Sequence, residues 1–159
     1  MKMADFLAAL LERDAWIFSE TANRLSGEEF FARPVPGANH PAWQLGHLIA
    51  SERKMLVKAG ATMPDLPPGF AETFTPDTAA VDDPARVPDK QTLLDLFRQT
   101  RAASAAFARG LSDDDLEKPT GEQWAPTVAD LLAVQAGHAD MHVGQLQVLR
   151  RKLGKPIMF

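Results

Sequence analysis

The chain has 159 residues, 45% hydrophobic and 24% charged, a composition typical of one globular domain that buries its own core. Its net charge of −4 argues against a nucleic-acid-binding surface, which needs clustered basic residues. The chain contains no cysteine, and this excludes disulfides, thiolate metal ligands and a cysteine nucleophile. We therefore expect a single domain over residues 1–159 with no nucleic-acid partner.

The N-terminal segment gives no sign of export. Residues 1–11 are apolar but run directly into Glu12, Arg13 and Asp14 without a small-residue cleavage site. No stretch of the sequence is apolar for long enough to span a membrane. The sequence predicts a cytoplasmic protein without a membrane partner.

The first half of the chain predicts two helices. Apolar residues recur at helical spacing over residues 3–25, and the prolines and the glycine of residues 31–37 then break the pattern. A second helix should begin at Pro41, because proline fits the first helical turn and disfavours the α conformation of His40 before it. This helix should end near Gly60.

Residues 61–88 contain six prolines and no sustained periodicity, which predicts a long crossover rather than another element. Parallel neighbours in a helical bundle need such a connection, whereas antiparallel neighbours need only a short turn. The crossover therefore predicts up-down-down-up topology. Phe70 and Phe74 should anchor it to the bundle, and the alternative role for them is lining a substrate pocket.

Two further helices are predicted after the crossover. One fits residues 91–109 and is followed by Gly110 as a C-terminal cap, and residues 112–116 should form a short capped turn. Thr127 and Asp130 have the spacing of a capping box, which should open a last helix running to about Leu153. No segment alternates convincingly with period two. The predicted fold class is all-α, a four-helix bundle.

Three of the four histidines form one pattern. His138 and His142 are four residues apart and share a helix face, while His47 faces the core from the predicted helix at 41–60. A lone buried histidine usually bonds a backbone carbonyl, but three inward imidazoles each need a partner, and one ion satisfies all three. The same periodicity predicts that the last helix buries Val128, Leu131, Val134, Gln135, His138, Met141, His142, Gln145 and Leu149.

The glycines before two of these histidines have two interpretations. Gly46 and Gly137 lie inside predicted helices, where glycine is about 1 kcal/mol less favourable than alanine. Close approach of the two histidine-bearing helices would explain both glycines, and simple packing without a metal is the alternative.

The ligand set limits the chemistry. Ala139 stands where a zincin motif has its glutamate base, so a metalloprotease is disfavoured. Histidine ligands without thiolates suit a divalent ion, with zinc or nickel first and iron or manganese next. Gln145 and Ser51 lie one turn from ligands and could orient water or substrate, and Trp43 could wall a cofactor or substrate pocket. Ordinary packing contacts are the alternative for these three residues.

Two stretches carry a resemblance to a known family. His40-Pro-Ala-Trp-Gln-Leu-Gly-His-Leu48 and His138-Ala-Asp-Met-His-Val-Gly-Gln-Leu146 resemble the signature segments of the DinB-like superfamily, also called YfiT-like metal-dependent hydrolases. The resemblance implies a four-helix bundle whose metal triad is His47, His138 and His142. It also implies hydrolase activity or thiol-dependent S-transfer, in which a low-molecular-weight thiol such as bacillithiol, mycothiol or glutathione is the cosubstrate.

Two classes of function compete at this point. One is a metal-dependent enzyme acting on a small-molecule substrate, and the other is a noncatalytic metal-binding stress-response protein. Structural zinc sites usually have four protein ligands, and the remaining imidazole, His40, should lie about 10 Å from His47 along the helix axis. His40 is therefore expected to be a cap or a support. An exposed apolar helix face predicts a homodimer.

Overall fold

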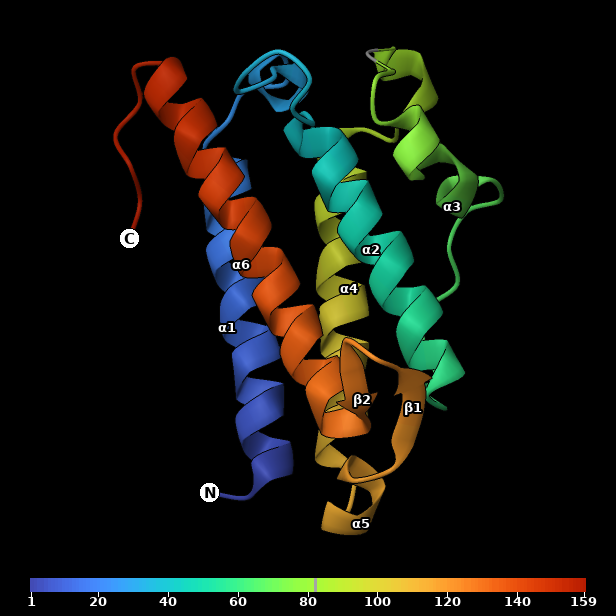
Figure 1. Ribbon diagram of the computed structural model, residues 1–159. Helices are drawn as coiled ribbons and strands as arrows, with labels where there is room; N and C mark the ends of the chain where they lie inside the picture. The colour runs from blue at the N-terminus through green and yellow to red at the C-terminus, as the bar shows by residue number, and fades with distance from the viewer. Residues whose placement is uncertain (82) are drawn as a thin grey trace.

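Four long helices form the bundle in the computed structural model, which describes residues 1–81 and 83–159 (Figure 1). They are α1 (Met3–Asn23), α2 (Pro41–Lys58), α4 (Lys90–Arg109) and α6 (Val128–Lys152). Helices α1 and α6 run in one direction and α2 and α4 in the other, so the predicted up-down-down-up topology is confirmed. No described helix has the length and apolarity needed to cross a membrane.

The helix ends follow from local capping chemistry. His40 caps α2, because its Nδ1 accepts the backbone N–H of Trp43 at 3.1 Å, and Pro41 occupies the first turn. Thr127 and Asp130 form the predicted capping box at the start of α6. These signals placed each end of the four helices within two residues of its observed position.

The crossover between α2 and α4 is more ordered than the sequence predicts. It contains α3 (Phe70–Thr73) and two 3₁₀ turns, η2 (Pro76–Thr78) and η3 (Pro84–Arg86); another such turn, η1 (Glu29–Phe31), precedes α2. Phe70 and Phe74 are only 3% and 2% exposed, so the prediction that they anchor the crossover is confirmed.

Gly46 accommodates this crossover. A Cβ built at Gly46 would lie 2.3 Å from the Phe74 ring, so the glycine admits Phe74 and not the neighbouring helix α6. A Cβ at Gly137 would meet nothing within 4 Å. The prediction that both glycines serve close approach of α2 and α6 is therefore wrong.

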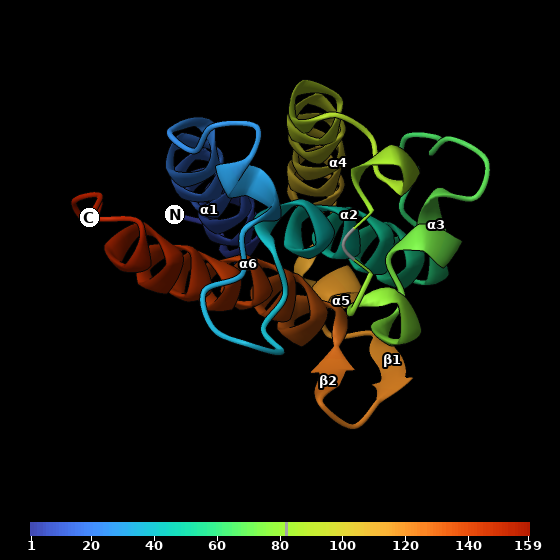
Figure 2. The ribbon, with the colours of Figure 1, turned by 90° about the horizontal axis from the view of Figure 1, so that it is seen from above.

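A small hairpin precedes α6 and was not predicted. After α5 (Asp113–Leu116), which has the expected serine cap, β1 (Pro119–Glu122) pairs antiparallel with β2 (Ala125–Thr127). Gly121 adopts a φ of 82° in this hairpin, a conformation that glycine tolerates best. The hairpin lies across the lower ends of α2 and α6 (Figure 1), and seen from above it stands outside the group of four long helices (Figure 2).

A buried polar layer divides the interior into two apolar clusters. In this layer Arg101 Nε contacts Glu52 Oε2 at 2.9 Å, and both side chains are at most 2% exposed. Ser104 Oγ donates to Glu52 Oε1 at 2.5 Å, and Arg101 Nη2 donates to the carbonyl of Gln135 at 2.9 Å. Burial raises the pKa of Glu52, although Arg101 and Ser104 oppose this shift. The layer ties α2, α4 and α6 together at mid-height.

Candidate metal centre

Helices α2 and α6 bring the three predicted histidines together. His47, His138 and His142 each offer a ring nitrogen, and these nitrogens all lie within 4.8 Å of one another. His138 Nε2 and His142 Nε2 are 3.2 Å apart. Two nitrogens bound tetrahedrally to one zinc ion at about 2.0–2.1 Å would be about 3.3 Å apart, so this spacing fits a shared ion. In the metal-free protein it also fits an N–H···N hydrogen bond between the two rings.

Burial keeps the cluster neutral at physiological pH. It lowers the pKa of His138 to about 4, and neighbouring charge on His47 and Arg101 acts in the same direction. The pKa of His142 also falls to about 4, chiefly through burial and then through His138 and His47. Burial lowers the pKa of His47 as well. Each imidazole therefore stands in the neutral form, with one ring N–H and one free lone pair, and this is the form that binds metals.

Gln44 determines which nitrogen of His142 faces the cluster. Its side chain is fully buried, and its Nε2 donates to the carbonyl of Asn39 at 2.6 Å. That bond orients Oε1 toward His142 Nδ1, 3.3 Å away. Because an amide oxygen only accepts, Nδ1 must carry the proton and Nε2 must present a lone pair to the other histidines. This role was not identified from the sequence, although Gln44 lies three residues before His47 and therefore on the same face of α2.

His47 is held from two sides by the segments around it. It donates a hydrogen bond to the backbone carbonyl of Phe74, which opposes the lowering of its pKa. Trp43 stacks on its ring with centroids 4.8 Å apart and an interplanar angle of 7°, and Trp43 Nε1 donates to Thr78 Oγ1 at 3.2 Å. Trp43, for which the sequence left a pocket wall and ordinary packing as alternatives, is only 6% exposed and lies against the His47 ring.

The other candidate residues lie at the edge of the centre. Ser51 is partly buried, donates to the carbonyl of Leu48 at 3.2 Å, and lines a cavity of about 570 Å³ beside His47. Gln145 is exposed, yet its side chain forms a hydrogen bond with His142 that opposes the lowering of the His142 pKa, as an acceptor does. Met141 is 64% exposed. The prediction that Met141 and Gln145 are buried is therefore wrong, because the core face of α6 is rotated from the predicted stripe toward Ala139 and Leu146, which are buried.

The fourth histidine takes no part in the cluster. His40 is 1% exposed, and besides capping α2 its Nε2 lies 3.2 Å from the carbonyl of Val81. Its expected role as a cap is confirmed. Among the residues the structure describes, no carboxylate joins the three histidines within their shared 4.8 Å.

Comparison with known proteins assigns the family. Residues 10–146 match the model of the DinB superfamily. The chain belongs to the DinB superfamily. No curated protein sequence matches it.

Two solved structures share the fold. A conserved protein from Enterococcus faecalis has 21% identity and a TM-score of 0.69, and the match covers 98% of this chain and 99% of that one. YfiT from Bacillus subtilis has 16% identity and a TM-score of 0.67, with coverage of 96% and 89%. YfiT is described as a probable metal-dependent hydrolase with an unusual four-helix bundle topology.

Proposed function

We propose that this protein is a metal-dependent hydrolase in which His47, His138 and His142 hold one divalent cation. The observation that carries the proposal is the orientation of two of these rings. Gln44 takes the outer N–H of His142, and the Phe74 carbonyl takes that of His47. Metal-binding histidines characteristically donate the second ring nitrogen to such an acceptor, which fixes the ring and raises its basicity.

The donor set suits a borderline metal. Three neutral nitrogen ligands favour zinc or nickel, followed by iron or manganese, and they leave at least one coordination position for a substrate or water. When bound there, a divalent ion supplies Lewis acidity and lowers the pKa of a coordinated water or thiol. His138 must present its Nε2 lone pair to such an ion, so its ring proton has to reside on Nδ1.

The chain's own residues position the substrate. The Ser51 hydroxyl lies one helical turn from His47 and faces the same cavity, where it can donate to a carbonyl or phosphoryl oxygen. Gln145 contacts His142 from the solvent side and can orient a water. The likeness to YfiT, a probable metal-dependent hydrolase, supports hydrolysis as the reaction class.

One observation favours a second reaction, transfer to an external thiol. Hydrolysis commonly uses a protein carboxylate as general base, and none accompanies the histidines among the described residues. A thiol acidified by the ion needs no such base, and a chain without cysteine must obtain its thiol from solution. Thiol-dependent S-transfer is therefore the second candidate.

Elemental analysis of untagged protein tests the metal centre. We expect about one ion per chain in the wild type and loss of that ion in His47→Ala and His142→Ala. His40→Asn is the matched control, because asparagine can still cap α2 and His40 lies outside the cluster. Retention of stoichiometric metal in His142→Ala, or no ion in the wild type after reconstitution with zinc, nickel or manganese, would overturn the proposal.

Activity assays distinguish the two proposed enzymes, the hydrolase and the thiol transferase, from a noncatalytic metal-binding stress protein. The metal-loaded wild type is assayed with activated esters and with alkylating electrophiles, each with and without bacillithiol, mycothiol or glutathione. Turnover without thiol supports the hydrolase, and turnover only with thiol supports the transferase. Metal binding without turnover on any substrate would favour the noncatalytic protein.

A further inference from the structure

A hollow lies against α2 beside the candidate metal centre. The cavity of about 570 Å³ lies between α2 and the crossover, and His47 is one of its lining residues. This volume is in the range of sites that bind small organic molecules. The hollow therefore has the size and the position to hold the non-reacting body of a substrate.

Three polar residues form a row along the floor of this cavity. His47, Ser51 and Lys54 are spaced at i, i+4 and i+7, so they stand on one face of α2, and all three line the cavity. Lys54 lies seven residues from His47, which is about 10 Å along the helix axis. The row thus places a cationic side chain on the same helix face as a candidate metal ligand.

The walls of the cavity are largely apolar. Phe74 and Leu66 come from the crossover, and Val57 lies at the far end of α2 with 46% of its surface exposed. An exposed valine inside a hollow is apolar surface that a ligand would remove from water. An apolar ligand body fits these walls better than a sugar or a polyol.

The charges in the cavity leave one cation for a ligand. Arg53 is engaged, because its Nε donates to the carbonyl of Pro64 at 2.7 Å and its Nη2 lies 3.4 Å from Asp65. Glu72 lies on the crossover wall and is exposed. Lys54 makes no ion pair within 4 Å with any residue in the described parts of the chain. Its charge interacts with that of Glu122 at longer range and helps to lower the pKa of Glu122.

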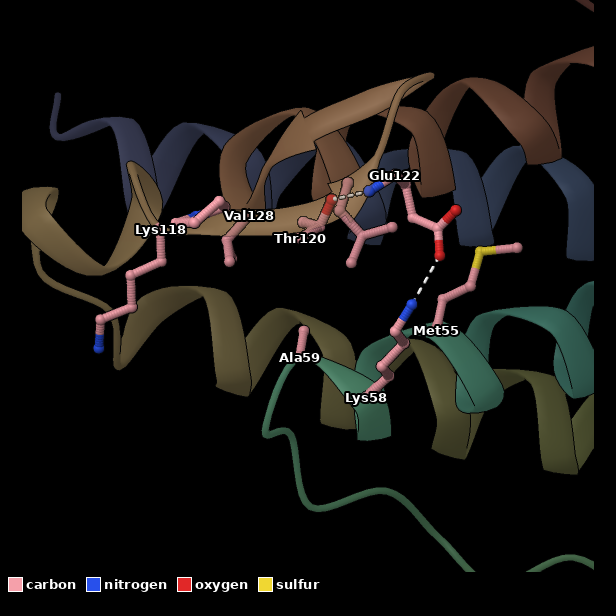
Figure 3. Close-up of a pocket in the computed structure, with 9 residues that line it drawn as sticks. Met55, Lys58, Ala59, Lys118, Thr120, Glu122 and Val128 are labelled. Atoms are coloured by element: carbon pink, nitrogen blue, oxygen red, sulfur yellow. Dashed lines mark hydrogen bonds and ion pairs between the residues drawn. The ribbon is translucent and has the colours of Figure 1, made fainter.

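The next lysine along α2 gives an internal contrast (Figure 3). Lys58 Nζ lies 2.7 Å from Glu122 Oε1 across a second cavity of about 200 Å³ under the hairpin. The hairpin therefore neutralises Lys58 and leaves Lys54 available to an incoming anion.

We infer that the cavity binds an apolar carboxylate whose anionic group contacts Lys54 and whose reacting group lies about 10 Å away at the histidine cluster. This inference rests on the proposed function for the identity of the reacting end. The binding of the apolar body and the carboxylate is a property of the cavity and can be measured without metal.

The test titrates the metal-free protein with octanoate and, separately, with octanol. Binding of each probe is measured by the shifts of backbone amides in ¹H–¹⁵N NMR spectra. We expect octanoate to shift the amides of Ser51, Lys54 and Ala71 and to bind more tightly than octanol. Lys54→Met should weaken octanoate binding about tenfold and leave octanol binding unchanged. Lys58→Met, whose lysine is already paired with Glu122, is the matched control and should bind octanoate as the wild type does.

The outcomes distinguish this inference from the proposed function. Equal affinities for octanoate and octanol, equal losses in the two lysine variants, or shifts confined to amides outside the cavity would overturn it. His142→Ala removes a candidate ligand that does not line the cavity, so it should bind octanoate normally. A protein that binds octanoate but no metal would refute the metal centre and leave the carboxylate site standing.

Discussion

Two polar clusters lie on either side of α2, one fully buried and one partly buried, and they differ in what their polar groups contact. Toward α4, Glu52 and Arg101 neutralise one another, and Ser104 and the Gln135 carbonyl take up further bonds. Toward α6, three neutral imidazoles place nitrogens within 4.8 Å of one another. The charges of the first cluster balance one another within the chain, as expected for a structural element, although the buried Arg101 Nη1 makes no hydrogen bond to any described residue. The second cluster brings three ligand nitrogens together, as expected for a binding site.

The largest effect should come from breaking the structural cluster. Glu52→Gln leaves the Arg101 guanidinium buried without its counter-charge, which we expect to lower the free energy of unfolding by about 3–5 kcal/mol. Urea denaturation of the metal-free protein measures this loss. The folded fraction of the variant should still bind one metal ion, because the ion pair contributes no ligand.

A double variant controls for the ion pair. Glu52→Met combined with Arg101→Met removes both charges, and replacement of a buried pair by apolar residues is often close to neutral. We therefore expect most of the lost stability to return. A loss below about 1 kcal/mol in Glu52→Gln would contradict a structural role for the pair.

Much of the fold could be predicted because its signals are local. Pro41, Gly110 and the Thr127–Asp130 capping box lie close to the helix ends that they determine. The hairpin escaped prediction because β1 and β2 have four and three residues, too few to show alternation. The short helices of the crossover are hidden in the same way.

The sequence predicts the three candidate metal ligands but not the residues that orient their rings. The histidine spacing on α6 fixes which face carries two of them, whereas the contact between Gln44 and His142 spans 98 residues. Gly46 leaves space for the Phe74 ring of the crossover, a contact that helical periodicity cannot reveal. Met141 and Gln145 were assigned to the core because helical periodicity leaves open a rotation of the buried face, and α6 turns Ala139 and Leu146 inward instead.

A smaller effect should come from Gln44, which contacts the histidine cluster without being a candidate ligand. Gln44→Met keeps the volume but removes the acceptor for His142 Nδ1–H, and loss of such a support weakens metal binding about 10- to 100-fold. Gln44→Glu keeps an acceptor for His142 Nδ1–H but loses the donor to the Asn39 carbonyl, so it should bind the ion more tightly than Gln44→Met. Competition with a zinc chelator gives both affinities. Equal affinity in Gln44→Met and the wild type would show that the tautomer is set elsewhere.

The smallest effects should come from the two glycines, and they separate the cluster's support from ordinary helix propensity. Gly137→Ala places a methyl group in open space and should raise the free energy of unfolding by about 1 kcal/mol. Gly46→Ala gains the same propensity, but its Cβ would lie 2.3 Å from the Phe74 ring, and such overpacking costs about 1–3 kcal/mol. Thermal denaturation of the metal-free proteins should therefore give a higher melting temperature for Gly137→Ala and a lower one for Gly46→Ala.

The same two variants should also differ in metal affinity. The displaced Phe74 carries the carbonyl that orients His47, so Gly46→Ala should bind metal more weakly although no ligand has changed. Gly137→Ala lies next to His138 but displaces nothing, so it should bind metal normally. The reverse order of affinities would mean that the crossover has no part in holding the metal centre.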